Sequence, residues 1–359
     1  MKTTWWGVIW IGIELLGSSL ALAANPEHIQ RLTSTNQCPK CDLSGADLRG
    51  MVLAGANLGN ANLRGANLAG ANLEGAKLFN ADITEANLGN ANLKQADLGN
   101  VNLAKSILIR ANLERANLNG ANLVHTDCSE ANLRQASISL ANLEKANLSD
   151  VNLSGADLTG SVLTGVNLSQ ARLHHAVLNR VNLDQADLTD ARMEGVKLRE
   201  ASLVGATLPR VRLSRADLVA AKLGGANLRE ADLSQADLTG VDLTAARLDR
   251  ANLAQATLEG AKLKKVSLVT ANLPATNLIQ ADLSDSDLRG ANISRARLQD
   301  ANLSNSNLSV VNLNHTNLTG ANLAGADLTG AQVQQAIMGN TNLNGTIGLD
   351  KLVGRTQIP

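Results

Sequence analysis

The chain has 359 residues, and its 32 Lys and Arg balance 32 Asp and Glu, so the formal net charge is zero. A neutral chain has no overall field that attracts nucleic acid or imitates its charge. Phe79 is the one aromatic residue after residue 23, and stacking on single-stranded bases needs aromatic platforms. Composition therefore argues against nucleic acid as a partner.

Residues 1–23 have the pattern of a secretory signal peptide. Lys2 supplies the basic end, residues 5–16 are mainly apolar, and Ala-Leu-Ala at 21–23 fits a small-x-small cleavage site. Glu14 interrupts the apolar run, so an uncleaved membrane anchor is the alternative. No Cys directly follows the site and no twin-Arg pair precedes it, which favours export by a Sec-type route without lipid anchoring. We expect no membrane association after cleavage.

Residues 24–40 are predicted to form an N-terminal cap helix and a linker. Asn25 can cap a helix that has Pro26 at its first position, and Ile29 and Leu32 then share one face. A short amphipathic helix over residues 25–35 would cover an end of the structure that follows it.

Cys38-Pro39-Lys40-Cys41 allows three interpretations. A zinc site usually needs a second pair of ligands, and the remaining cysteine, Cys128, lies far along the chain. A redox motif usually begins a helix in a βαβ unit, which the sequence does not predict. A structural disulfide between Cys38 and Cys41 would suit an oxidising compartment, and we favour it. Cys128 is interpreted as a small buried apolar residue.

The segment 41–345 repeats every five residues. An apolar residue recurs without one insertion from Leu43 to Leu343, at 61 positions of which 54 are Leu. The residue two positions earlier is usually Ala, the residue directly before is mostly Asn or Asp, and Gly is common two positions later. Asn and Asp side chains bond nearby backbone in turns, and Gly allows a corner with positive φ.

A period of five excludes ordinary elements. On a helix, five residues advance the face by roughly 140°, and on a flat strand an odd period alternates faces. The leucines all point inward only if the chain turns a corner at every repeat and coils about an axis. Four repeats per coil close a square tube, an all-β solenoid of about 15 coils that is roughly 70 Å long.

The motif A-(N/D)-L-x-x resembles that of the pentapeptide-repeat proteins over about 300 of the 359 residues. The resemblance implies a right-handed quadrilateral β-helix. Ile107 and Val162 depart from the pattern on the outside, and Pro209 and Pro274 follow the central Leu. An exported chain with a capped start that bears two cysteines is similar to cyanobacterial members. The bacterial periplasm or the thylakoid lumen is therefore the expected location.

Residues 346–359 are predicted to form a C-terminal cap or tail. Leu343 is the last leucine in phase, and Gly348 breaks the pattern. We expect Ile347, Leu349, Leu352 and Val353 to supply an apolar cover.

Residues 20 apart should stack on one wall of the tube. Arg172, Arg192 and Arg212 would then form a ladder, with His174, His175 and Arg215 at the neighbouring corner. Stacked arginines repel unless an anion lies between them, so the ladder is a candidate site for an anion or an acidic partner. Alternatively, Glu194 and Asp232 on the same wall neutralise it, because exposed charges usually form a solvated face. We favour the second interpretation.

The sequence contains no motif of a nucleophile, phosphate loop or metal site, and a filled tube offers no cleft for a substrate. We expect no enzyme activity and no cofactor. The leading hypothesis is an exported rigid scaffold or protein-interaction rod, either a monomer or an end-to-end dimer, with an unidentified protein partner. Two alternatives are a DNA mimic that binds a topoisomerase and a thiol–disulfide protein built on Cys38 and Cys41.

Overall fold

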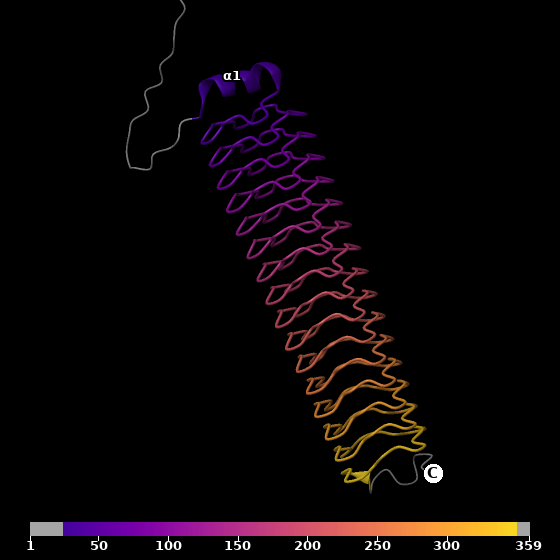
Figure 1. Ribbon diagram of the computed structural model, residues 1–359. Coiled ribbons are helices and arrows are strands. Elements are labelled where there is room, and N and C mark those ends of the chain that lie inside the picture. The colour runs from indigo at the N-terminus through magenta and orange to yellow at the C-terminus, as the bar shows by residue number, and fades with distance from the viewer. Residues whose placement is uncertain (1–23, 350–359) are drawn as a thin grey trace, which may run out of the picture.

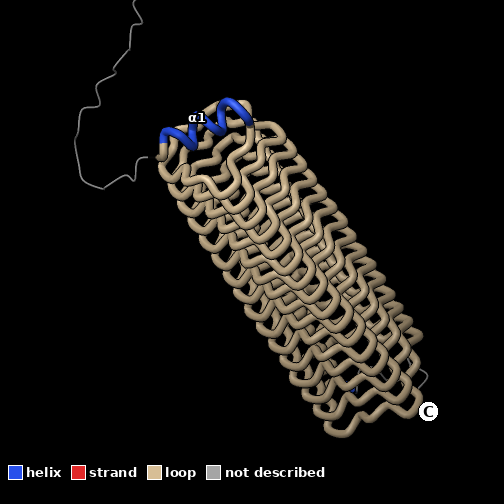
Figure 2. Tube along the Cα trace, turned by 45° about the horizontal axis from the view of Figure 1, so that its top comes forward, coloured by secondary structure: helices blue, strands red, loops and turns tan. Residues whose placement is uncertain are grey.

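Each repeat contributes one side of a four-sided tube. In the computed structural model, which describes residues 24–349, the residue before each central position, as far as Asp327, forms a parallel β-bridge with the residue 20 positions later. The bridges run from the pair Gln37 and Asn57 to the pair Asp327 and Ile347. The coils stack into the long straight rod of Figure 1, and Figure 2 looks more steeply along its axis. The predicted quadrilateral β-helix is confirmed.

The corners explain why the repeat has five residues. The Ala46 N–H donates to the Leu43 carbonyl at 3.1 Å, and Gly45 between them has φ of 65°. An i to i+3 hydrogen bond with positive φ at the third residue is the combination found in type II turns. The third corner residue has a φ between 53° and 73° in every repeat from Lys40 to Gly345. The predicted left-handed corner is therefore present throughout, although 42 of these 62 positions are not glycine.

The core is a column of leucines flanked by small residues. Central leucines such as Leu198 are fully buried, and so are residues two positions earlier such as Val196. Pro209 and Pro274 occupy the second residue of their turns, where the fixed φ of proline fits. Their carbonyls still accept the inter-coil hydrogen bonds from Asp190 and Gln255, so neither proline interrupts the tube.

Asparagine columns join the coils on the outside. Asn132 Nδ2 donates to Asn112 Oδ1 at 3.1 Å, and Asn112 Nδ2 donates to Asn92 Oδ1 at 3.3 Å. Each Oδ1 also accepts a backbone N–H of its own corner, as Asn112 does from Glu114 at 3.2 Å. These bonds confirm that the asparagines have a structural role.

Helix α1, Pro26–Thr35, lies across the N-terminal end of the tube (Figure 1). The Asn25 side chain caps it by accepting the Glu27 N–H, and Leu32 is buried against the core. The predicted cap helix is thus present. The first coil begins at Gln37, inside the segment predicted as a linker, because Cys38 occupies a central slot in phase with the leucines.

At the other end, the wall continues to Ile347, two residues beyond the predicted end of the repeats. Ile347 is 59% exposed on this wall, so its assignment to an apolar cover is wrong, whereas Leu349 packs partly against the core. Leu352, Val353 and the predicted signal peptide at 1–23 lie outside the described residues. Within residues 24–349 no helix has the length and apolar character needed to cross a membrane.

Candidate partner-binding wall

The N-terminal cysteines lie between α1 and the first coil. Cys38 and Cys41 form a disulfide with Cα atoms 5.3 Å apart, and both residues are buried. The His28 carbonyl oxygen of α1 lies 3.2 Å from Cys38 Sγ, and His28 Nδ1 accepts the Asp42 N–H at 2.9 Å. The pair therefore links two inward slots beneath the helix. Among residues 24–349, no three side chains of the His, Cys, Asp and Glu type gather as a metal site.

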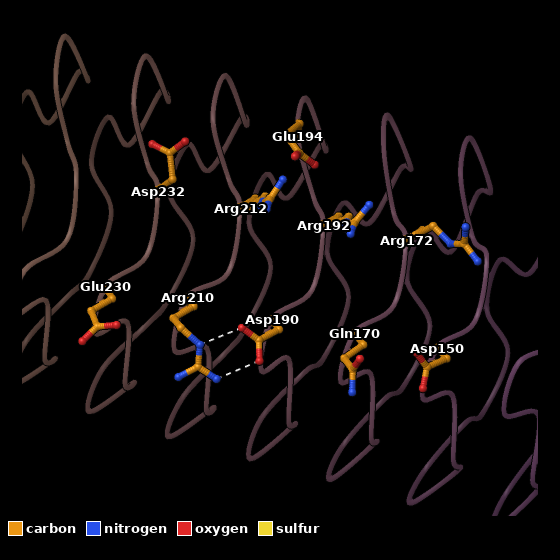
Figure 3. Close-up of a pocket in the computed structure, with 10 residues that line it drawn as sticks. All are labelled: Asp150, Gln170, Arg172, Asp190, Arg192, Glu194, Arg210, Arg212, Glu230 and Asp232. Atoms are coloured by element: carbon orange, nitrogen blue, oxygen red, sulfur yellow. Dashed lines mark hydrogen bonds and ion pairs between the residues drawn. The ribbon is translucent and has the colours of Figure 1, made fainter.

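The three arginines of the predicted ladder lie on consecutive coils of one wall. Arg172 bridges to Arg192, and Arg192 bridges to Arg212. Figure 3 shows their side chains in one row, extended to the same side of the wall. All three are exposed, and neighbouring rungs are ~4.8 Å apart, as in any β-pairing.

This row interrupts an asparagine column. The same wall carries asparagine on consecutive rungs from 72 to 152 and again from 252 to 312, with Asp232 before the second run. The asparagines near each end of the gap are joined by amide hydrogen bonds, such as Asn272 Nδ2 to Asn252 Oδ1 at 3.1 Å. An arginine side chain has no acceptor, so three successive rungs give up this stabilising bond.

The nearby carboxylates are engaged elsewhere. Asp190 forms two hydrogen bonds of 2.7 Å with Arg210, at the corner before the wall (Figure 3). Asp232 accepts the Ser234 N–H at 3.1 Å and Asn252 Nδ2 at 3.0 Å. Within residues 24–349, no carboxylate lies within 4.0 Å of the three guanidinium groups of the row. Glu194 and Asp232, which the favoured interpretation from sequence assigns to neutralise the row, line the same groove but form no direct ion pair with it.

Glu194 instead faces a histidine. Its Oε2 lies 2.9 Å from His174 Nδ1, but the two groups are not aligned for a hydrogen bond, and this oxygen is buried without a hydrogen-bond partner. His175 covers Gly195 so closely that a Cβ there would lie 2.6 Å from His175 Nδ1. Arg215 donates to Gln235 Oε1 at 2.9 Å. His174, His175 and Arg215 thus lie beside the row as predicted, and each contacts a residue 20 positions later rather than another of the three.

The wall and the preceding corner enclose a shallow groove of about 730 Å³. Its centre is the arginine row, and its lining comprises four arginines, five carboxylates and one amide: Asp150, Gln170, Arg172, Asp190, Arg192, Glu194, Arg210, Arg212, Glu230 and Asp232. A second hollow of about 630 Å³ adjoins it at His175 and Arg215. The groove is therefore polar: the arginine row runs along it with Asp232 at one end, and Arg210 and the other carboxylates lie on either side of that row.

The row has a modest electrostatic cost. Two unit charges ~5 Å apart repel by about 1 kcal/mol in water, and salt screens part of this. The fold tolerates this repulsion. The arginines, however, add no stabilising contact between coils beyond those that asparagine provides at the same positions elsewhere.

The 20-residue spacing located the arginine row and its histidine corner from sequence. It did not identify Asp190 and Arg210 as lining residues, although these two also lie 20 apart and form an ion pair of 2.7 Å. The sequence does contain this information, because Asp190 and Arg210 are opposite charges 20 residues apart in the column of corner residues just before the wall.

Comparison with known proteins supports this architecture. A family model described as "Pentapeptide repeats (8 copies)" matches the chain in overlapping segments between residues 41 and 345. A comparison with curated protein sequences gave no significant match.

Solved structures with similar repeats include HetL, a pentapeptide repeat protein involved in heterocyst differentiation regulation in the cyanobacterium Nostoc. It is 34% identical over 58% of this chain and 89% of its own, with a TM-score of 0.33. A pentapeptide repeat protein of the Arabidopsis thaliana thylakoid lumen is 34% identical over 29% of this chain and 65% of its own, with a TM-score of 0.15. QnrB1, a plasmid-mediated fluoroquinolone resistance protein, is 19% identical over 53% of this chain and 88% of its own, with a TM-score of 0.26.

The family model spans most of the chain, and it matches the segment that the structure shows as a stack of four-sided coils. The chain therefore belongs to the pentapeptide repeat family, and its tube is the right-handed quadrilateral β-helix of that family.

Proposed function

We propose that this protein is an exported, rigid, non-enzymatic rod that binds another protein in the periplasm or thylakoid lumen. The observation that carries the proposal is the polar groove around the arginine row, on a tube whose interior is filled with leucine. A filled tube presents walls and corners rather than a desolvated cleft, and such surfaces suit recognition better than catalysis.

Export is supported by two features of the N-terminal region. Residues 1–23 have the composition of a signal peptide, and the Cys38–Cys41 disulfide suits an oxidising compartment. The intact mass of the protein purified from its native cells tests this part. We expect a chain that begins at Ala24 and lacks two hydrogens; a full-length chain with free thiols would refute export.

The two alternatives have less support. A mimic of duplex DNA needs a strongly negative surface, whereas this chain has a formal net charge of zero. Thiol–disulfide exchange needs an accessible sulfur, whereas Cys38 and Cys41 are both buried beneath α1.

Binding is tested by site-specific photo-crosslinking in native cells. A photoreactive amino acid is placed on each side of the tube in turn, at Asn182, Asp187, Lys197 and, beside the arginine row, Ser214. We expect a discrete cross-linked protein from at least one position. If none of the four positions yields a cross-link, the proposal of a protein-binding rod is wrong.

A further inference from the structure

We infer that the row of Arg172, Arg192 and Arg212 binds a helix of the partner protein that presents a line of carboxylates. This inference rests on the proposed function and names the chemistry of the partner. It begins from the position of the row, which together with Asp232 occupies the four rungs between two runs of asparagine on one wall.

The arginines have no structural role that the wall requires. Asparagine on the flanking rungs forms inter-coil hydrogen bonds, whereas none of the three guanidinium groups has a carboxylate within 4.0 Å in the described part of the chain. A local departure from the best-stabilised pattern, without a compensating contact, is typical of functional sites. The groups are exposed and extended in one direction, as a carboxylate ligand requires (Figure 3).

The spacing of the row favours a helix over a strand. Neighbouring rungs are ~4.8 Å apart, so the first and third arginines are separated by ~9.6 Å along the rod. Acidic residues at positions i, i+4 and i+7 of a helix lie on one face and span about 10.5 Å. Alternate residues of a strand are about 6.7 Å apart, so three of them span about 13 Å. A helix that lies along the groove axis therefore matches the ladder rung by rung.

The margins of the groove select against a uniform polyanion. Asp150, Asp190 and Glu230 lie in the row beside the arginines, Glu194 lies on their other side, and Asp232 continues the arginine row on the next rung (Figure 3). These carboxylates repel a ligand that is negative on all sides, such as a nucleic acid. They accept a helix whose acidic line is flanked by basic or neutral residues.

Two helical peptides of roughly 20 residues and identical composition test the inference. One carries its glutamates at i, i+4 and i+7 with lysines on the adjacent faces, and the other has the same glutamates dispersed around the helix. Binding to the purified full chain is measured by fluorescence anisotropy at low and physiological salt. We expect the striped peptide to bind at least about tenfold more tightly, since each charge-assisted hydrogen bond contributes roughly that factor.

The variants follow from the asparagine column. Arg192→Asn and the triple variant R172N/R192N/R212N restore the residue that the wall carries elsewhere, so we expect both to fold with unchanged or higher thermal stability. The single variant should lose about tenfold in affinity, and the triple variant should lose all measurable binding. Arg297 is a solitary exposed arginine between Asn277 and Asn317 on another wall, so Arg297→Asn is the matched control and should bind normally.

Three results would overturn the inference: equal binding of the two peptides, undiminished binding by the folded triple variant, or an equal loss in R297N. Competition by a DNA duplex as strong as that by the striped peptide would instead identify a general polyanion site. Cross-linking from Asn182, Asp187 or Lys197 without any from Ser214 would contradict this site and leave the protein-binding rod intact.

Discussion

Val310 provides a direct test of how the corners limit stability. It occupies the third residue of its corner with a φ of 59°, and its side chain is 66% exposed. A left-handed conformation costs an L-residue about 1–2 kcal/mol, and the cost is highest for β-branched side chains. Val310→Gly removes this cost, but the greater freedom of glycine in the unfolded chain returns about 0.5–1 kcal/mol.

The substitution leaves the other interactions of the corner in place. The Val310 N–H donates to the Thr329 carbonyl at 2.8 Å, and glycine retains this bond. Little buried area is lost because most of the side chain already faces solvent. We therefore expect a net local stabilisation of about 0.5–1 kcal/mol.

Hydrogen exchange measured by mass spectrometry resolves this effect along the rod. A repeat protein unfolds in local units, so amides in the coils next to Val310 should exchange about two- to fivefold more slowly, whereas distant coils should not change. Val204 is the matched control, because it is an exposed valine at the second residue of its corner, where φ is not positive. Val204→Gly should accelerate local exchange. Faster exchange in V310G, or the same change in both variants, would refute the account of the corners.

Three further predictions concern the ends and the ionisable groups. The double variant of Cys38→Ala and Cys41→Ala should lose about 2 kcal/mol, confined to α1 and the first coils, and hydrogen exchange that rose uniformly along the rod would contradict local stability. Burial raises the pKa of the Cys128 thiol to about 12, so iodoacetamide at pH 8 should modify it only in denaturant; rapid modification of the native protein would disprove this burial. Hydrogen bonds from the Thr329 side chain and backbone lower the pKa of Asp327 below its usual 3.8. The stability that this carboxylate contributes is therefore present above pH 3.8 and lost as the pH falls through the folded pKa, so the urea midpoint of Asp327→Asn should decrease less steeply with acid than that of the wild type. Parallel curves for the two proteins would exclude that contribution.

Most of the fold was predictable because the repeat is local and continuous. Central positions have the same environment in every coil, so an apolar residue at every fifth position fixes both the inward face and the length of a side. The phase alone also places residues 20 apart on one wall, so the sequence predicts a ladder of Arg172, Arg192 and Arg212. The same spacing of 20 residues assigns the outward residues to columns on the four walls.

The ends of the tube were less predictable, because residues other than leucine occupy the positions there that are in phase with the repeat. Cys38 fills a central slot and extends the tube to Gln37, but a search for leucine does not detect it. The apolar character of Ile347 predicts a place in a cover, yet the residue continues the wall and is mostly exposed. At a chain end, the neighbouring coil that would determine the orientation of a residue is present on one side only.

The sequence by itself determined the period, the inward residues, the corners and the alignment of side chains into columns, because each follows from chain geometry within one coil. Only the tertiary structure decided which charges meet. Asp190 pairs with Arg210 at the corner, Glu194 turns to His174, and the three arginines of the wall retain no carboxylate partner within residues 24–349. The physical reason is that a long charged side chain can reach several partners at similar distances. Which partner it contacts depends on rotamers and hydrogen-bond alignment, which the repeat does not specify.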